Sequence, residues 1–239
     1  MENSEQNTSV AKLVIISSVL ALLLLVILHF ISPEFDPSWR MVSEYALGSH
    51  QWALTLFFLF WGCSTICLAI ILKKEVSSIW AKAGVFLLFV SGIGTAMAAA
   101  FDVEHPLHGL AAALGIPTLI IAALLISYHL SKKPYWAADK KRLLLSAHST
   151  WLSLVLMVAA MMLMMSGFQN AGIEYAENAA PPESVPDGVI ALGGYVNRLL
   201  ILAYVSWLII TARSYIKIHG RAPAGIQYNS ELVQASRVD

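Results

Sequence analysis

Three ionisable residues border long apolar runs of this chain, where a charge requires a partner or a route to water. Asp102 closes one apolar run, His108 opens the next, and Arg198 stands near the start of the last run. About 22 Å of helix separates Arg198 from Arg213, which is less than the hydrocarbon thickness of a bilayer. Arg213 can reach water beside Lys217, so we expect Arg198 to pair with an acidic side chain inside the protein.

Asp102 is the expected partner of Arg198. About 30 Å of helix separates it from Lys82, which places Asp102 at a membrane boundary in the last turn of its helix. The negative end of the helix dipole disfavours an anion there, so Asp102 needs a cation or a proton. His108 falls in the first turn of the following helix, where the positive end of the dipole favours the neutral imidazole.

These residues are suited to two kinds of chemistry. Arginine recognises carboxylates and phosphates in a bidentate manner, so Arg198 could hold a lipid headgroup or a small anion. The ligand-binding set that we expect is Arg198, Glu44, Ser43 and Asn197. In an enzyme, His108 would instead act as a general base oriented by Asp102. A third interpretation is structural, with Asp102, His108 and Arg198 as a clasp between three helix ends.

A metal site is an alternative use of the same membrane face. A catalytic zinc ion usually has three protein ligands and one open position. The candidate ligands are His108, Asp102 and His105, with His50 or Glu44 as alternatives for the third position. Such a site would make the chain a metal-dependent intramembrane hydrolase that acts on a lipid. The alkaline ceramidases offer an analogy, although the His105/His108 pair does not match their His-x-x-x-His spacing.

Histidines near both membrane faces suit haem as a second cofactor. His29, His50 and His108 are expected near one face, and His129 and His148 near the other. Two stacked b-haems with axial histidines would need this arrangement to carry electrons across a membrane. A b-haem membrane electron carrier is therefore a further alternative.

The elements that must position these residues are apolar helices. A spanning helix needs about 20 mainly apolar residues, because the hydrocarbon core is about 30 Å thick. Six runs qualify: residues 11–31, 52–72, 80–101, 106–130, 143–165 and 189–216. Backbone groups in lipid must be satisfied within the segment, so each run is expected to be a helix. The predicted fold is an all-α integral membrane protein, a six-transmembrane-helix bundle.

Composition excludes several other classes of protein. The 239 residues are 58% hydrophobic and 13% charged, far from the roughly one quarter charged of a soluble domain. Fifteen basic and fifteen acidic residues cancel, which excludes nucleic acid as a partner. Cys63 and Cys67 lie in one apolar run, so a secreted disulfide scaffold is excluded as well. The expected partners are membrane lipids, for a monomer or a homo-oligomer.

Charge in the loops predicts the orientation of the chain. The basic residues cluster in the short loops on one side, so both termini are predicted to be cytoplasmic, in a plasma or inner membrane. The polar cluster then faces the extracytoplasmic side. The predicted organisation is a cytoplasmic N-terminal segment (1–10), a transmembrane domain (11–218) and a flexible cytoplasmic tail (219–239). The first helix is expected to remain as an anchor, because no cleavage pattern follows it.

Several short motifs resemble one known family. They are Ser43-Glu44 with Gly48, Phe101-Asp102, His108-Gly109, and Asn197-Arg198 with Trp207. Together they resemble the bacterial and archaeal membrane-protein family catalogued as domain of unknown function 998. The resemblance implies the six-helix fold and assigns no reaction. It marks as the shared polar set Ser43, Glu44, Asp102, His108 and Arg198. The linker between Asp102 and His108 is shorter than the family pattern and carries His105.

Overall fold

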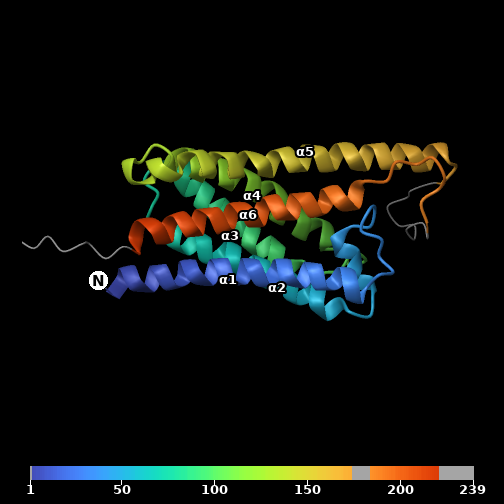
Figure 1. Cartoon of the computed structure of the whole chain (residues 1–239), viewed down its shortest axis with the longest axis horizontal. Coiled ribbons are helices and arrows are strands. Elements are labelled where there is room, and N and C mark those ends of the chain that lie inside the picture. Colours follow the sequence, from blue (N-terminus) through green and yellow to red (C-terminus); the bar gives the residue numbers. More distant parts are fainter. Residues whose placement is uncertain (1, 174–183, 221–239) are drawn as a thin grey trace, which may run out of the picture.

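The computed structural model describes residues 2–173 and 184–220. Within these ranges the chain forms six long helices and two short 3-10 helices, with no strand. The long helices are α1 (Glu2–Ile31), α2 (Gln51–Leu72), α3 (Ile79–Met97), α4 (His108–Leu130), α5 (Lys140–Asn170) and α6 (Gly193–His219), shown in Figure 1. All six are long and apolar enough to cross a membrane, so the predicted six-helix bundle is confirmed.

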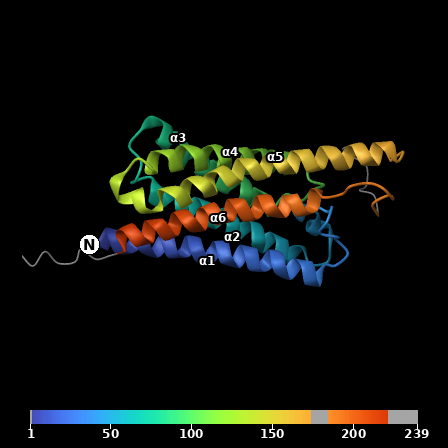
Figure 2. The same cartoon turned by 45° about the horizontal axis from the view of Figure 1, so that its top comes forward.

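The helices close into a ring. Each long helix contacts the next one in sequence, and α1 also contacts α6. The two views in Figures 1 and 2 show all six helices running along a common axis. The start of α1 and the end of α6 lie together at one end of the bundle (Figure 1). We call this end the basic end, because basic residues gather there: Lys73, Lys74, Lys132 and Lys133 between helices, and Lys140, Lys141 and Arg142 in the first turn of α5.

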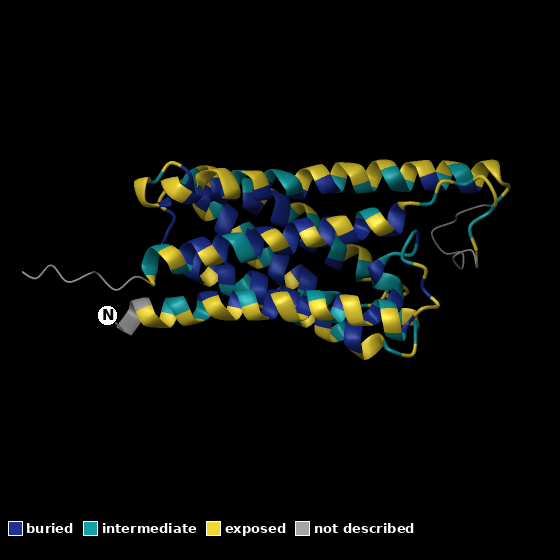
Figure 3. Cartoon of the chain, viewed as in Figure 1, coloured by how far each residue is buried: buried dark blue, intermediate teal, exposed yellow. Residues whose placement is uncertain are grey.

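Apolar side chains occupy both the inside and the outside of the bundle. Buried positions follow one side of most helices and are densest along α6 (Figure 3). Trp207 and Tyr204 of α6 are completely enclosed, whereas Phe30 and Met162 are exposed on outer surfaces. Lipid tails are as apolar as these side chains, so an apolar exterior is the expected solution in a membrane.

Glycines allow α2, α3 and α4 to approach closely. A Cβ atom on Gly62 would lie 2.9 Å from the carbonyl oxygen of Gly92, and one on Gly94 would lie 2.6 Å from the backbone nitrogen of Gly115. Carbon atoms do not fit at these distances, so larger residues would push the helices apart. Small residues are the usual means of close helix packing in membranes.

Pro117 interrupts the hydrogen bonding of α4, because proline has no N–H to donate. Two neighbouring helices bond to carbonyls beside the interruption. Ser91 Oγ of α3 donates to the carbonyl of Gly115 at 2.7 Å, and the Tyr204 hydroxyl of α6 donates to that of Ile116 at 3.1 Å. These two carbonyls, beside the interruption, therefore have side-chain donors from neighbouring helices.

Helix boundaries differ from the prediction at several ends, by up to nine residues, and α5 (Lys140–Asn170) is longer at both ends than the predicted 143–165. α1 begins at Glu2, so most of the predicted N-terminal segment is helical. α3 ends at Met97 rather than at Phe101, because the chain turns before Asp102, whose Oδ1 accepts a bond from the Glu104 N–H at 3.1 Å. Residues 221–239 of the predicted tail lie outside the described residues.

Candidate functional site

Arg198 is the centre of a polar cluster at the end of the bundle away from the basic end. The residue is only 8% exposed. Its Nε donates to Nε2 of His29 at 2.7 Å, and its Nη2 donates to the Tyr45 hydroxyl at 3.1 Å. Its Nη1 donates to the carbonyls of Arg40 at 2.8 Å and Gly194 at 2.9 Å. Four of the five guanidinium N–H donors are thus bound to protein acceptors. We call Arg198, His29, Tyr45 and the Arg40 carbonyl the arginine clasp.

His29 enters the clasp as a neutral side chain. Its Nδ1 lies 2.6 Å from the carbonyl of Leu25, an acceptor, so Nδ1 carries a proton. Its Nε2 accepts from Arg198 and therefore carries none. The Tyr45 ring meets the His29 ring edge-on, with centroids 6.0 Å apart. The clasp joins α1, α6 and the short helix η1 (Val42–Leu47) without a carboxylate.

Glu44 and Ser43 lie beside the clasp in η1. Glu44 Oε2 accepts from Arg40 Nη1 at 2.8 Å, and Glu44 Oε1 accepts from the Met41 N–H at 2.9 Å. This carboxylate therefore neutralises Arg40 and also closes the start of η1. Ser43 is half-buried next to it.

Asn197 connects η1 to α6. Its Oδ1 accepts from the Val42 N–H at 3.0 Å, and its Nδ2 lies 3.6 Å from Met157 Sδ on α5. The structure therefore brings together at one end of the bundle the four predicted ligand-binding residues Arg198, Glu44, Ser43 and Asn197. Their side-chain contacts are to other parts of the same chain.

Asp102 lies apart from the clasp. Its carboxylate is exposed and accepts a bond within its own turn. The expected pair between Asp102 and Arg198 is not formed, which corrects that prediction. The reason is that α3 ends before Asp102, while neutral acceptors satisfy Arg198. An exposed carboxylate is solvated and requires no buried cation.

The other two candidate metal ligands follow Asp102 in the chain: His105 lies in the loop before α4, and His108 is the first residue of α4. His108 Nδ1 lies 3.0 Å from the carbonyl of Phe101. His105 stacks on the Phe101 ring with centroids 4.5 Å apart, and its Nδ1 accepts from the Leu107 N–H at 3.1 Å. Among the described residues, no group of three or more His, Cys, Asp or Glu side chains is placed to hold a metal ion.

The other histidines considered as haem ligands have protein partners. His50 Nδ1 lies 3.3 Å from Ser32 Oγ. At the basic end, His129 Nδ1 lies 3.2 Å from Ser78 Oγ, and the partners of His148 are Tyr128 at 3.1 Å and Trp151 at 2.9 Å. A haem would have to displace these hydrogen bonds.

The basic end contains a buried carboxylate that the sequence did not lead us to expect. Glu75, between α2 and α3, is only 7% exposed. Its Oε1 lies 3.0 Å from His219 Nε2 on α6, and its Oε2 accepts from the Tyr135 hydroxyl at 3.3 Å. Lys133 Nζ donates to the Glu75 carbonyl and to the Tyr135 oxygen. The Tyr215 ring packs against the His219 ring at a tilt of 35°, with ring centroids 4.4 Å apart. We call these five residues the Glu75 network.

A second ion pair reinforces the same end. Asp139, the last residue of the short helix η2 (Pro134–Asp139), is buried and lies 3.0 Å from Lys217 Nζ of α6. Lys217 and His219 both belong to the last turn of α6. That turn thus meets two buried acids, Glu75 and Asp139.

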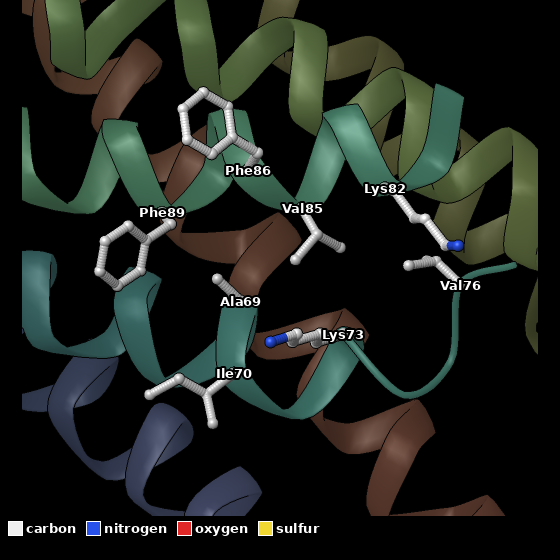
Figure 4. A pocket seen from close by; sticks show the side chains of 8 residues that line it. All are labelled: Ala69, Ile70, Lys73, Val76, Lys82, Val85, Phe86 and Phe89. Atoms are coloured by element: carbon white, nitrogen blue, oxygen red, sulfur yellow. The ribbon is translucent and has the colours of Figure 1, made fainter. Parts of the chain in front are cut away.

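A groove opens between α2 and α3 near the Glu75 network, with a volume of about 600 Å³ (Figure 4). Phe86 and Phe89 lie at one end of it, and Lys82 and Val76 lie at the other. Lys73 of α2 lines it as well. Both lysines are exposed, and neither forms an ion pair with another residue that the structure describes. The groove therefore combines an apolar part with uncompensated positive charge.

Comparison with known proteins identifies the family. No curated protein and no solved structure shows a significant match to the chain. A family model described as protein of unknown function (DUF998) matches residues 15–214, which is most of the sequence and includes the clasp and the groove. The chain therefore belongs to the DUF998 family.

Proposed function

We propose that the protein binds an anionic phospholipid in the groove between α2 and α3. The observation that carries the proposal is the combination of exposed aromatic rings at one end of the groove with two unpaired lysines, Lys73 and Lys82. An acyl chain would lie along Phe86 and Phe89, and the ammonium groups would bind the phosphate. The volume falls within the roughly 300–1,000 Å³ of typical ligand pockets.

The groove suits a headgroup better than the arginine clasp does. Arg198 is buried and has one guanidinium N–H beyond those bound to the protein. An anion there would have to displace His29 or Tyr45. The lysines of the groove have no such competitor among the described residues, so a phosphate gains a new contact with each of them.

The position of the groove fits the predicted orientation. We propose that the basic end faces the cytoplasm of a plasma or inner membrane, as the positive-inside rule predicts. The cytoplasmic leaflet carries anionic lipids, and each lysine close to its surface contributes about 1 kcal/mol of attraction. Lipid binding here would be selective for charge.

The test compares two lipids and two pairs of lysines. Labelled phosphatidylglycerol and phosphatidylcholine are titrated onto the detergent-solubilised protein. We expect tighter binding of phosphatidylglycerol, and a loss of about 30-fold in Lys73→Gln/Lys82→Gln, from about 1 kcal/mol per lysine. The control is Lys74→Gln/Lys132→Gln, which removes two exposed lysines of the same end that do not line the groove. Equal affinity for both lipids, or equal losses in both variants, would contradict the proposal.

A further inference from the structure

A smaller cavity lies at the end of the bundle away from the basic end. Its volume is about 230 Å³, and its wall comes from η1, the first turns of α2 and the turn that follows α3. The polar side chains that line it are those of Gln51, Thr55 and Asp102, and we call it the Asp102 pocket. The pocket shares no lining residue with the groove between α2 and α3, so the two are separate sites.

The polar side chains of the Asp102 pocket have bonding capacity that the protein does not use. Asp102 Oδ1 accepts from the Glu104 N–H, and within the described residues no hydrogen bond reaches Asp102 Oδ2. The Gln51 amide and the Thr55 hydroxyl likewise form no side-chain hydrogen bond with any residue that the structure describes. All three side chains are therefore able to bind a ligand without giving up a partner.

Backbone carbonyls at the end of α3 add further acceptors. The wall of the pocket is mainly polar although most of its residues are alanine or leucine, so backbone atoms form part of it. The alanines of the turn after α3 are Ala98, Ala99 and Ala100, and their carbonyls accept no hydrogen bond from the described part of the chain. Carbonyls at the end of a helix carry the negative end of its dipole. Carboxylate and carbonyls together make the pocket a site of negative character.

Such a site suits a monovalent organic cation. Asp102 forms no ion pair with a described residue, and no basic residue is among those described that line the pocket. Its single carboxylate balances one positive charge, whereas calcium sites commonly combine several carboxylates. A water molecule occupies about 30 Å³ of liquid, so the pocket is also larger than a bare ion requires.

We propose that the Asp102 pocket binds the primary ammonium group of an organic amine. An ammonium group has three N–H donors, which the Asp102 carboxylate, the Thr55 hydroxyl and the free carbonyls after α3 would accept. Free ethanolamine and the headgroup of phosphatidylethanolamine both present this group. The quaternary ammonium of phosphatidylcholine has the same charge and no N–H, so it would leave these acceptors unpaired and bind more weakly.

The first test uses free ethanolamine and the full chain in detergent, with the dissociation constant measured by saturation-transfer NMR. Asp102→Asn should weaken binding about five-fold, the size expected for one solvent-exposed ion pair. The matched control is Glu104→Gln, because Glu104 is an exposed carboxylate in the same turn that does not line the pocket. Ethylene glycol, in which a hydroxyl replaces the ammonium group, should not compete.

A second variant tests the space in the pocket rather than its charge. Ala100 is exposed, so a larger side chain there can be tolerated by the fold while it reduces the room for a ligand. Ala100→Leu should therefore weaken ethanolamine binding and keep Asp102 intact. Lys73→Gln/Lys82→Gln should leave ethanolamine binding unchanged, because those lysines line the other site. Failure of the groove proposal is thus distinguishable from failure of this one.

The source of the amine is decided by a lipid experiment. Phosphatidylethanolamine and phosphatidylcholine are offered in equal amounts, and native mass spectrometry counts the lipids that the protein retains. A preference for phosphatidylethanolamine that Asp102→Asn removes assigns the pocket to the lipid headgroup. Ethanolamine binding without that preference assigns it to free amines. Neither ethanolamine binding nor the lipid preference in the wild type, or equal losses in Asp102→Asn and Glu104→Gln, would overturn the site.

Discussion

Replacing Arg198 with methionine removes the guanidinium and keeps an unbranched apolar side chain. His29 Nε2, the Arg40 carbonyl and the Tyr45 hydroxyl each lose a donor at 2.7, 2.8 and 3.1 Å, respectively. Hydrogen bonds from a charged group contribute about 1.5–3 kcal/mol each, and relief from burying the charge offsets part of that sum. We expect a net loss of about 3 kcal/mol in the free energy of unfolding.

The assay is unfolding in mixed micelles by titration with sodium dodecyl sulfate, followed by tryptophan fluorescence. A loss of about 3 kcal/mol corresponds to a decrease in melting temperature of roughly 6–12 °C for a domain of this size. Arg213→Met is the control, because Arg213 lies on the same helix and is exposed. Stability of Arg198→Met within about 0.5 kcal/mol of wild type would refute the clasp.

Three further predictions concern other parts of the bundle. Gly94→Ala should destabilise the protein by about 1–3 kcal/mol, because the added Cβ would lie 2.6 Å from the Gly115 nitrogen. Gly109→Ala is the control and should be neutral or stabilising, because a Cβ at Gly109 would have no neighbouring atom within 4 Å. The same detergent titration measures both variants. Asp102→Asn should change the melting temperature by no more than about 2 °C, because its carboxylate is exposed and has no buried cation; a larger decrease would indicate an undetected partner. Lys217→Met should lower the free energy of unfolding by about 1–2 kcal/mol in the same titration, because it leaves the buried carboxylate of Asp139 without its cation; an unchanged value would contradict the role of this ion pair.

The six helices could be predicted because a single apolar segment of this length has to form a helix to satisfy its backbone groups inside a bilayer. Helix ends were less predictable, since they depend on turns such as the one at Asp102. The need of Arg198 for partners inside the bundle was predicted correctly, but the identity of the partner was not. Formal charge suggested Asp102, whereas the fold supplies a neutral histidine and backbone carbonyls. Carbonyls are present at every position, so sequence reasoning cannot select among them.

The features of the basic end were harder to predict. Glu75 follows two lysines in a short loop, a pattern typical of a solvated turn. Its burial depends on the last turn of α6 folding over it, and that turn is more than 140 residues away in sequence. The groove depends on how α2 and α3 pack against each other. The hydropathy of the sequence does not describe that packing, so the groove could not be predicted.

The arginine clasp also sets an order on the biosynthesis of the protein. His29 lies in the first helix and Arg198 in the last, so their bond cannot form until nearly the whole chain has been synthesised. Before that point the guanidinium does not exist, and the first helix sits in the membrane with an unfilled acceptor. Chains that stop before α6 lack the contact between α1 and α6 that closes the ring of helices. Incomplete and finished proteins therefore differ in a physical feature that the quality-control machinery of a cell could detect.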